Sequence, residues 1–167
     1  MNERAPAPGG LALVEALVNT LSVDTGEDRL AETFALSGDE LAGAEELREA
    51  LRAACLAHAG QDMPPEAAGT LTRLLSGAPL VVTVDQEGAA ALSAAGDGSG
   101  LTARIAAAVA EAVTAGTWSR LKACEAEDCR WAYYDRSPAG RSRWCTMSVC
   151  GSRAKMRTYR AKRTPKP

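Results

Sequence analysis

Apolar residues recur at helical spacing in four segments of the first two thirds of the chain. Leu and Val residues three or four positions apart give each segment one apolar face, as in helices that cover a core. A Ser-x-x-Glu sequence that begins at Ser37 predicts a capping box, and two prolines suit the start of the third segment. The pattern therefore predicts helices over 11–21, 37–60, 64–77 and 101–116.

A short β-branched segment separates the third and fourth of these helices. Residues 80–84 read Leu-Val-Val-Thr-Val, which is typical of a strand. A turn at 86–88 would allow this strand to pair with 89–93. We therefore expect a mainly helical N-terminal domain with one small β-hairpin.

The composition is that of a soluble, folded protein. Of the 167 residues, 46% are hydrophobic and 24% are charged, values near the average for globular domains. The longest segment without a charged residue, 74–84, is too short for a membrane-spanning helix, which needs roughly 20 residues. The N-terminus lacks the order of basic, apolar and small residues that marks a secretory signal. We therefore expect a cytoplasmic protein with reduced thiols.

The two ends of the chain differ sharply in charge. Residues 1–116 hold six Arg and no Lys against seventeen acidic residues, a formal charge of −11. Residues 117–167 hold thirteen basic and four acidic residues, a formal charge of +9. Four of the five cysteines and six of the seven aromatic residues also fall in 117–167. These two compositions predict two domains, an acidic one over 1–116 and a basic one over 117–167.

The acidic region offers no catalytic motif. It has no phosphate-binding loop, no His-Glu-x-x-His and no nucleophile elbow, so we expect no enzyme activity. The single histidine, His58, is expected to lie on the surface or to interact with the dipole of its helix C-terminus. Cys55 lies on an apolar helix face and is expected to be a small buried hydrophobe. The cluster Glu45, Glu46 and Glu49 indicates a solvated helix face, or alternatively a surface that holds the basic domain.

Four cysteines in the basic region have the spacing of a zinc site. Cys124 and Cys129 are separated by four residues, as are Cys145 and Cys150, and fifteen residues lie between the two pairs. Four thiolates complete the tetrahedral shell of Zn²⁺ and leave no position for water, so we predict one structural zinc ion per chain. Two disulfides or an iron–sulfur cluster are the alternatives. A region of this size has a marginal core, so we expect a chelator to unfold it.

The remainder of the basic region predicts a hairpin and a helix. Alternating residues at 131–135 indicate a strand, and a turn at 137–140 should lead into its partner. A helix is expected from Ser148 to near Pro165, docked on the hairpin through Val149 and Met156. The aromatic residues beside the cysteines are expected to form a small core rather than a base-stacking platform. The expected fold class is therefore α+β, with a mainly helical N-terminal domain followed by a small zinc-stabilised β-hairpin plus helix.

The basic residues of this region indicate a surface for nucleic-acid phosphates. An arginine can read guanine through two hydrogen bonds, so Arg153, Arg157 and Arg160, which share one helix face, are candidates for base contacts. The lysines and Arg163 are candidates for phosphate contacts. The full set of predicted nucleic-acid-binding residues is Arg141, Arg143, Arg153, Lys155, Arg157, Arg160, Lys162 and Arg163.

The residues around the cysteines also carry a family resemblance. The segments 121–124, 129–135, 141–147 and 150–155 resemble the CGNR-type zinc finger of bacterial proteins. In that family the finger follows an N-terminal domain called ABATE, described as a candidate stress-induced transcription regulator. Residues 11–116 resemble this domain more loosely, through 17–20 and 46–52. The chain departs from the Cys-Gly-Asn-Arg motif at one position, where Ser152 replaces Asn.

The resemblance and the charge together predict a DNA-binding transcriptional regulator. The N-terminal domain would act as a sensor, with a possible small-molecule effector, or as a homodimerisation domain. Double-stranded DNA is the expected partner, and the protein would associate with the nucleoid when bound to it. Two alternatives remain open at this point: an adaptor whose basic helix docks on an acidic protein, and a thiol-redox switch in which oxidation releases zinc.

Overall fold

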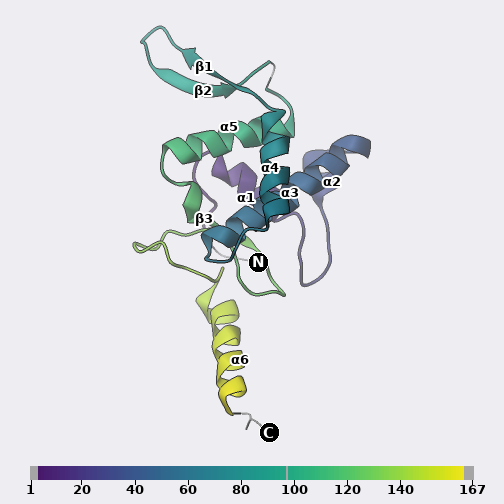
Figure 1. The fold of residues 1–167 in the computed structure, drawn as a ribbon, viewed down its shortest axis with the longest axis vertical. Coiled ribbons are helices and arrows are strands. Elements are labelled where there is room, and N and C mark those ends of the chain that lie inside the picture. Colours follow the sequence, from purple (N-terminus) through teal and green to yellow (C-terminus); the bar gives the residue numbers. More distant parts are fainter. Residues whose placement is uncertain (1–3, 97, 164–167) are drawn as a thin grey trace.

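The computed structural model describes residues 4–96 and 98–163, which form six α-helices, two short strand pairs and two short helical turns (Figure 1). No helix within these ranges is long and apolar enough to span a bilayer. The elements, in chain order, are α1 Leu11–Val18, α2 Leu30–Phe34, α3 Gly38–His58, α4 Pro65–Ser76, β1 Leu80–Val84, β2 Ala90–Ala94, α5 Leu101–Thr114, η1 Trp118–Arg120, β3 Leu121–Ala123, β4 Ala132–Tyr134, η2 Met147–Gly151 and α6 Ser152–Arg163.

The main core lies between α1, α3 and α5. Val14 and Leu17 of α1, Leu47 and Leu51 of α3, and Ile105 of α5 have no exposed side-chain surface. These residues belong to the periodic Leu, Val and Ile positions of the sequence, which confirms that the apolar faces of the predicted helices cover a core. The fold is therefore α+β, as expected, with helices forming most of the N-terminal part.

The helix boundaries agree with the sequence pattern to within a few residues, but the expected capping box does not form. Ser37 occupies the N-cap position with an extended backbone, yet its side chain makes no capping hydrogen bond. Gly38, the first residue of α3, has a φ of +53°, so the first turn of α3 begins with a left-handed residue. This local geometry separates the Ser37 hydroxyl from the amides that it would cap.

Strands β1 and β2 form the predicted hairpin. They pair antiparallel, with Val82 opposite Leu92 and Val84 opposite Ala90. Two backbone hydrogen bonds, from Asp85 N to Ala89 O and from Ala95 N to Pro79 O, close its two ends. The hairpin extends away from the helices beside α5, with β1 on its outer side (Figure 1).

The second strand pair differs from the sequence expectation. Strand β4 pairs antiparallel with β3, so the hairpin encloses the first cysteine pair rather than the turn at 137–140. The segment after that turn forms no strand, because it wraps around the carboxylate of Asp135. That carboxylate accepts hydrogen bonds from Ser137 N at 3.0 Å and from Ser142 N at 2.9 Å.

Helix α6 is not docked on this hairpin, and that part of the sequence prediction is wrong. The inner face of β3–β4 is already used, since Leu121, Ala123 and Ala132 are buried in the main core against α3. Val149 and Met156, the expected docking residues, are 45% and 50% exposed. Helix α6 instead projects from the body of the protein (Figure 1).

Candidate metal centre

The four C-terminal cysteines come together below the β3–β4 hairpin. Cys124 directly follows β3, and Cys129 lies in the loop that leads to β4. Cys145 precedes the π-helical turn η2, and Cys150 lies within it. All four Sγ atoms lie within 4.8 Å of one another.

The sulfur positions fit a tetrahedral ion and do not fit disulfides. The Sγ atoms of Cys129 and Cys145 are 3.6 Å apart, and those of Cys145 and Cys150 are 3.7 Å apart. A zinc ion with Zn–S bonds of about 2.3 Å separates its tetrahedral ligands by about 3.8 Å, whereas bonded sulfurs lie about 2.05 Å apart. All five cysteines are free. The donor set of four thiols therefore fits one zinc ion.

The thiols also influence one another electrostatically. Hydrogen bonds from Cys129 and Cys145 lower the pKa of Cys124. The interaction with Cys124 in turn raises the pKa of Cys129 and of Cys145. Burial is the main reason that the pKa of Cys150 is raised. The cluster therefore disfavours several negative charges at once, and a bound dication supplies the charge that lets all four sulfurs act as thiolates.

Aromatic residues form a small second core around the cysteines, as expected. Tyr133 is fully buried and its hydroxyl donates a hydrogen bond to Ser142 O at 2.8 Å. Trp131 and Trp144 are partly buried against the same cluster. Ser152, which replaces the Asn of the motif, donates a hydrogen bond from its hydroxyl to Met147 O at 3.1 Å and so closes the turn that carries Cys150.

A buried ion pair supports the loop between the two cysteine pairs. The Nζ atom of Lys122 lies 2.9 Å from Oδ2 of Asp135, and both side chains are almost completely buried. Lys122 also donates hydrogen bonds to Gly140 O at 2.6 Å and Ser142 O at 3.3 Å. The sequence analysis did not single out this pair, because one Lys and one Asp thirteen positions apart form no motif.

The environment of Asp135 favours its charged form. Burial would raise the pKa of its carboxyl group, but hydrogen bonds from Ser137, Lys122 and Ser142 outweigh the burial and lower the pKa. The carboxylate is thus ionised in the folded protein and ties β4 to the loop 137–142.

Three side chains of the N-terminal helices hold the backbone of the cysteine region. Asn19, directly after α1, donates from Nδ2 to Ala132 O at 3.0 Å and accepts from Ala132 N at 2.7 Å, like a neighbouring strand. Arg52 of α3 donates to Arg130 O at 3.1 Å. His58 Nδ1 lies 2.7 Å from Leu121 O, which can only accept, so this nitrogen donates.

His58 is therefore neither a free surface residue nor a dipole partner alone. Its ring packs edge-on against Trp118, with centroids 5.0 Å apart. Burial lowers the pKa of His58, although the bond to Leu121 opposes that effect. The neutral ring links the end of α3 to the start of β3. Cys55, as expected, is fully buried, and burial raises the pKa of its thiol to about 12.

Replacement of Asn19 tests this junction. We expect Asn19→Ala to lower the free energy of unfolding by about 1–3 kcal/mol, because Ala132 is fully buried and both of its backbone groups lose their partner. Urea unfolding of the zinc-loaded protein measures the change. Ser22→Ala, which removes one exposed hydrogen bond three residues away, should cost less than about 0.5 kcal/mol. Equal stability of the wild type and Asn19→Ala would contradict this role.

The predicted nucleic-acid-binding residues occupy different environments. Arg143 binds Glu125 through two hydrogen bonds and lies over the ring of Trp144, so it is committed to the finger itself. Arg153 lies 3.8 Å from a carboxylate oxygen of Asp128. Exposed side chains on the loop and on α6 are those of Arg141, Lys155, Arg157 and Arg160, whereas the side chains of Lys162 and Arg163 lie outside the described residues.

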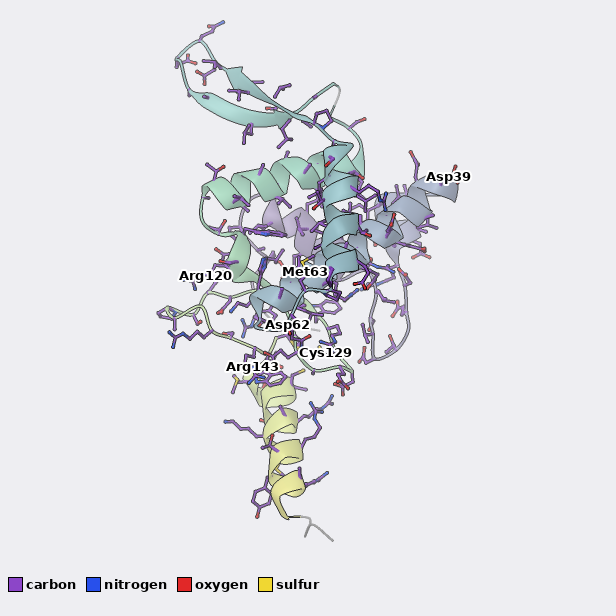
Figure 2. The ribbon with its side chains drawn as sticks, in the orientation of Figure 1. Asp39, Asp62, Met63, Arg120, Cys129 and Arg143 are labelled. Carbon is purple, nitrogen blue, oxygen red and sulfur yellow. The ribbon has the colours of Figure 1, made fainter. Side chains whose placement is uncertain are left out.

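The acidic face of α3 does not contact α6 in the described part of the chain. Glu46 pairs with Arg73 of α4, and Glu49 pairs with Arg48 and Arg52 of its own helix. Figure 2 places Asp39, at the start of α3, far from Cys129 and Arg143 at the base of α6. The described contacts thus agree with a solvated face rather than with a surface that holds the basic helix.

Comparison with known families divides the chain in the order that the sequence resemblance implies. Residues 10–116 match the family ABATE, described as "Putative stress-induced transcription regulator". Residues 120–163 match the CGNR zinc finger. A search of curated proteins found no match. The four clustered cysteines lie inside the second match, which agrees with one structural zinc ion held by Cys124, Cys129, Cys145 and Cys150.

Proposed function

The chain belongs to the ABATE family and carries a CGNR zinc finger, and on this basis we propose that it is a transcriptional regulator that binds double-stranded DNA through α6. The observation that carries the proposal is the position of this helix. Helix α6 begins immediately after Cys150, is rich in basic residues, and projects from the body with its side chains accessible (Figures 1 and 2).

The shape of α6 suits the major groove of DNA. A groove about 12 Å wide admits one α-helix, and a helix carried on a metal-held platform is a common way to present side chains there. Arg153, Arg157 and Arg160 follow one face of α6 and border a shallow surface groove together with Val149 and Met156. Apolar side chains on such a face can contact thymine methyl groups, and the arginines can contact guanine.

Charge supports the same partner. Six of the twelve residues of α6 are Lys or Arg and none is acidic. The cations would displace counterions from DNA phosphates, which makes binding strongly dependent on salt. Among the eight predicted contact residues, we assign base contacts to Arg157 and Arg160. Arg141, Lys155, Lys162 and Arg163 would contact phosphates, while Arg143 supports the finger.

The acidic domain, residues 1–116, would supply regulation rather than chemistry. It would respond to a small-molecule effector or bring two chains together, and neither role requires catalysis. We propose no enzyme activity, because the four thiolates of the zinc site leave no position for a reacting water. The protein would act in the cytoplasm and associate with the nucleoid when bound to DNA.

A thiol-redox switch is a second candidate, favoured by one observation. A cleft of about 410 Å³ between the loop that follows α1 and the finger is lined by Cys129, Cys145 and Cys150. A peroxide that enters this cleft could oxidise two thiolates to a disulfide, be reduced itself to water or an alcohol, and release zinc. Zinc release at low peroxide that a reductant reverses would support this role, and thiolates that stay unoxidised would remove it.

The first experiment is selection of genomic DNA fragments by the zinc-loaded full-length protein at about 150 mM salt, where non-specific binding is weak. Chelator-treated protein is the control. Enrichment of a shared sequence that the chelator abolishes would support a sequence-specific regulator. Absence of enrichment with zinc bound would instead favour an adaptor whose basic helix docks on an acidic protein.

Paired substitutions in α6 test which side chains contact DNA. We expect Arg157→Ala/Arg160→Ala to weaken binding to every sequence and to reduce the slope of log affinity against log salt by about 2 if both cations meet phosphates. The matched variant Arg157→Lys/Arg160→Lys keeps both charges, so it should retain non-specific affinity but lose discrimination between sequences. Equal affinity of the alanine variant and the wild type, with zinc bound in both, would reject α6 as the contact surface.

A further inference from the structure

Exposed apolar side chains gather in two places in the part of the chain that the structure describes. One group lies on η2 and α6, at the proposed DNA interface. The other lies on the β1–β2 hairpin and the outer side of α5, where no role has been assigned. The first group comprises Met147, Val149, Met156 and Tyr159, and the second comprises Val81, Val82, Val84, Leu92 and Val113.

The hairpin has one apolar face, which looks toward α5. Because directly paired residues share a face, Val82, Val84, Ala90 and Leu92 lie on the same side of the two strands. Thr83 lies on the opposite side, where its hydroxyl meets that of Ser93. The apolar face does not close against α5: Val82 remains 68% exposed, and a groove of about 910 Å³ separates the hairpin from the helix.

The outer edge of β1 is unprotected. Hydrogen bonds between the odd-numbered residues of β1 and β2 follow from the closing pair Asp85 and Ala89. Leu80, Val82 and Val84 therefore turn their N–H and C=O groups away from β2. No third strand pairs with β1 within 4–96 or 98–163. Natural proteins usually protect such an edge with a charge, a proline or a bulge, and β1 has none of these.

We propose that this edge is a homodimer interface, in which β1 of one copy pairs antiparallel with β1 of a second copy across a two-fold axis centred on Val82. The three outward residues are symmetric about Val82, so Leu80 of each copy would lie opposite Val84 of the other. The result is a four-stranded sheet with one continuous apolar face over the two α5 helices. Two strands alone are marginal in water, whereas four strands with a covered face are stable.

Charge favours a second copy as the occupant. The acidic domain carries a formal charge of −11, so two copies repel each other over most of this surface. Strand β1 is uncharged and can approach its own copy without like-charge contacts. The groove beside it contains one cation and one anion, Arg104 and Glu111. The same surface of a second copy offers each of them an opposite charge, as a two-fold interface requires.

The test is the mass of the full-length, zinc-loaded protein in solution, measured by sedimentation without DNA. We expect a dimer for the wild type. Val82→Lys places two like charges directly opposite each other and should weaken self-association by at least about tenfold. Val82→Thr keeps the branched shape and the outward N–H and should remain dimeric. A monomeric wild type, which would leave the edge to another kind of partner, or a Val82→Lys variant that still dimerises would overturn the proposal.

Cross-linking tests the register. In the proposed pairing the two Cα atoms at position 82 lie about 5.5 Å apart, within disulfide range. Those at position 84 lie about 13 Å apart. Mild oxidation should therefore link Val82→Cys chains and leave Val84→Cys chains unlinked, and the reverse result would overturn the register. This inference gives a structural basis to the dimerisation role within the proposed function. Its failure would leave DNA binding by α6 untouched, because neither measurement contains DNA.

Discussion

Removal of zinc is expected to unfold the cysteine region while the helices of the main core remain folded. The four thiols occupy the centre of a second core that otherwise consists of Tyr133, Ala126 and two partly buried tryptophans. Zinc binding to small fingers is worth about 10–16 kcal/mol, far more than so few apolar contacts can supply. Without the ion, thiols with opposed charges and no metal would no longer hold η2 against the hairpin.

The boundary of this unfolding is the sharper part of the prediction. Leu121, Ala123 and Ala132 are buried in the main core, and Asn19 and His58 hold the same strands. Hydrogen–deuterium exchange of chelated protein should therefore rise across 141–151 and stay low in β3. Exchange that is unchanged at 141–151 after chelation would contradict the prediction.

Cysteine variants provide the matched comparison. Cys124→Ser/Cys150→Ser should lose stoichiometric zinc and show the exchange pattern of chelated protein. Cys55→Ala alters the remaining cysteine, which is buried in the main core, and should keep one zinc per chain. Retention of one zinc per chain by the double variant would refute the ligand assignment.

Loss of the buried ion pair is expected to cost nearly as much stability as a typical domain can spare. We expect Lys122→Met or Asp135→Asn to lower the free energy of unfolding by about 3–5 kcal/mol, because each leaves a buried charge without its partner. The double variant should cost less than the sum of the single variants, since no lone charge remains. Glu46→Ala, which breaks the exposed pair with Arg73, should cost less than about 1 kcal/mol.

The ion pair also predicts a pH dependence. The pKa of Asp135 is lower in the folded protein than in the unfolded chain, so its contribution to stability is fully present above about pH 4. That contribution is lost as the pH falls through the folded pKa. Urea unfolding at a series of acidic pH values should therefore show a steeper loss of stability for the wild type than for Asp135→Asn. Parallel curves would show that Asp135 is not the responsible group.

The sequence predicted the elements that repeat and missed those that depend on single contacts. Periodic Leu and Val residues sufficed for α1, α3, α4 and α5, and the β-branched run 80–84 sufficed for β1. Helix α2 has five residues, too few to show a period. The partner of β4 was assigned wrongly because the choice depends on Asp135 and Lys122, whose burial no pattern in the sequence indicates.

The same distinction applies to the metal centre. Four cysteines at regular spacing indicate their own chemistry, and the structure brings all four together. The side chains that hold the finger carry no comparable signal, because Asn19, Arg52 and His58 bond to backbone atoms and leave no complementary residue to find. Asn19 and Arg52 do fall in the two segments, 17–20 and 46–52, through which the chain resembles ABATE.

The backbone bonds at this junction have a consequence for how such a protein can diversify. The carbonyl groups of Leu121, Arg130 and Ala132 are present whatever side chain occupies those positions. Substitutions in the finger, above all along α6, can therefore accumulate without weakening its attachment to the helical domain. A lineage with this architecture could acquire new recognition properties at the C-terminal helix while the N-terminal domain, and whatever signal it receives, stays the same.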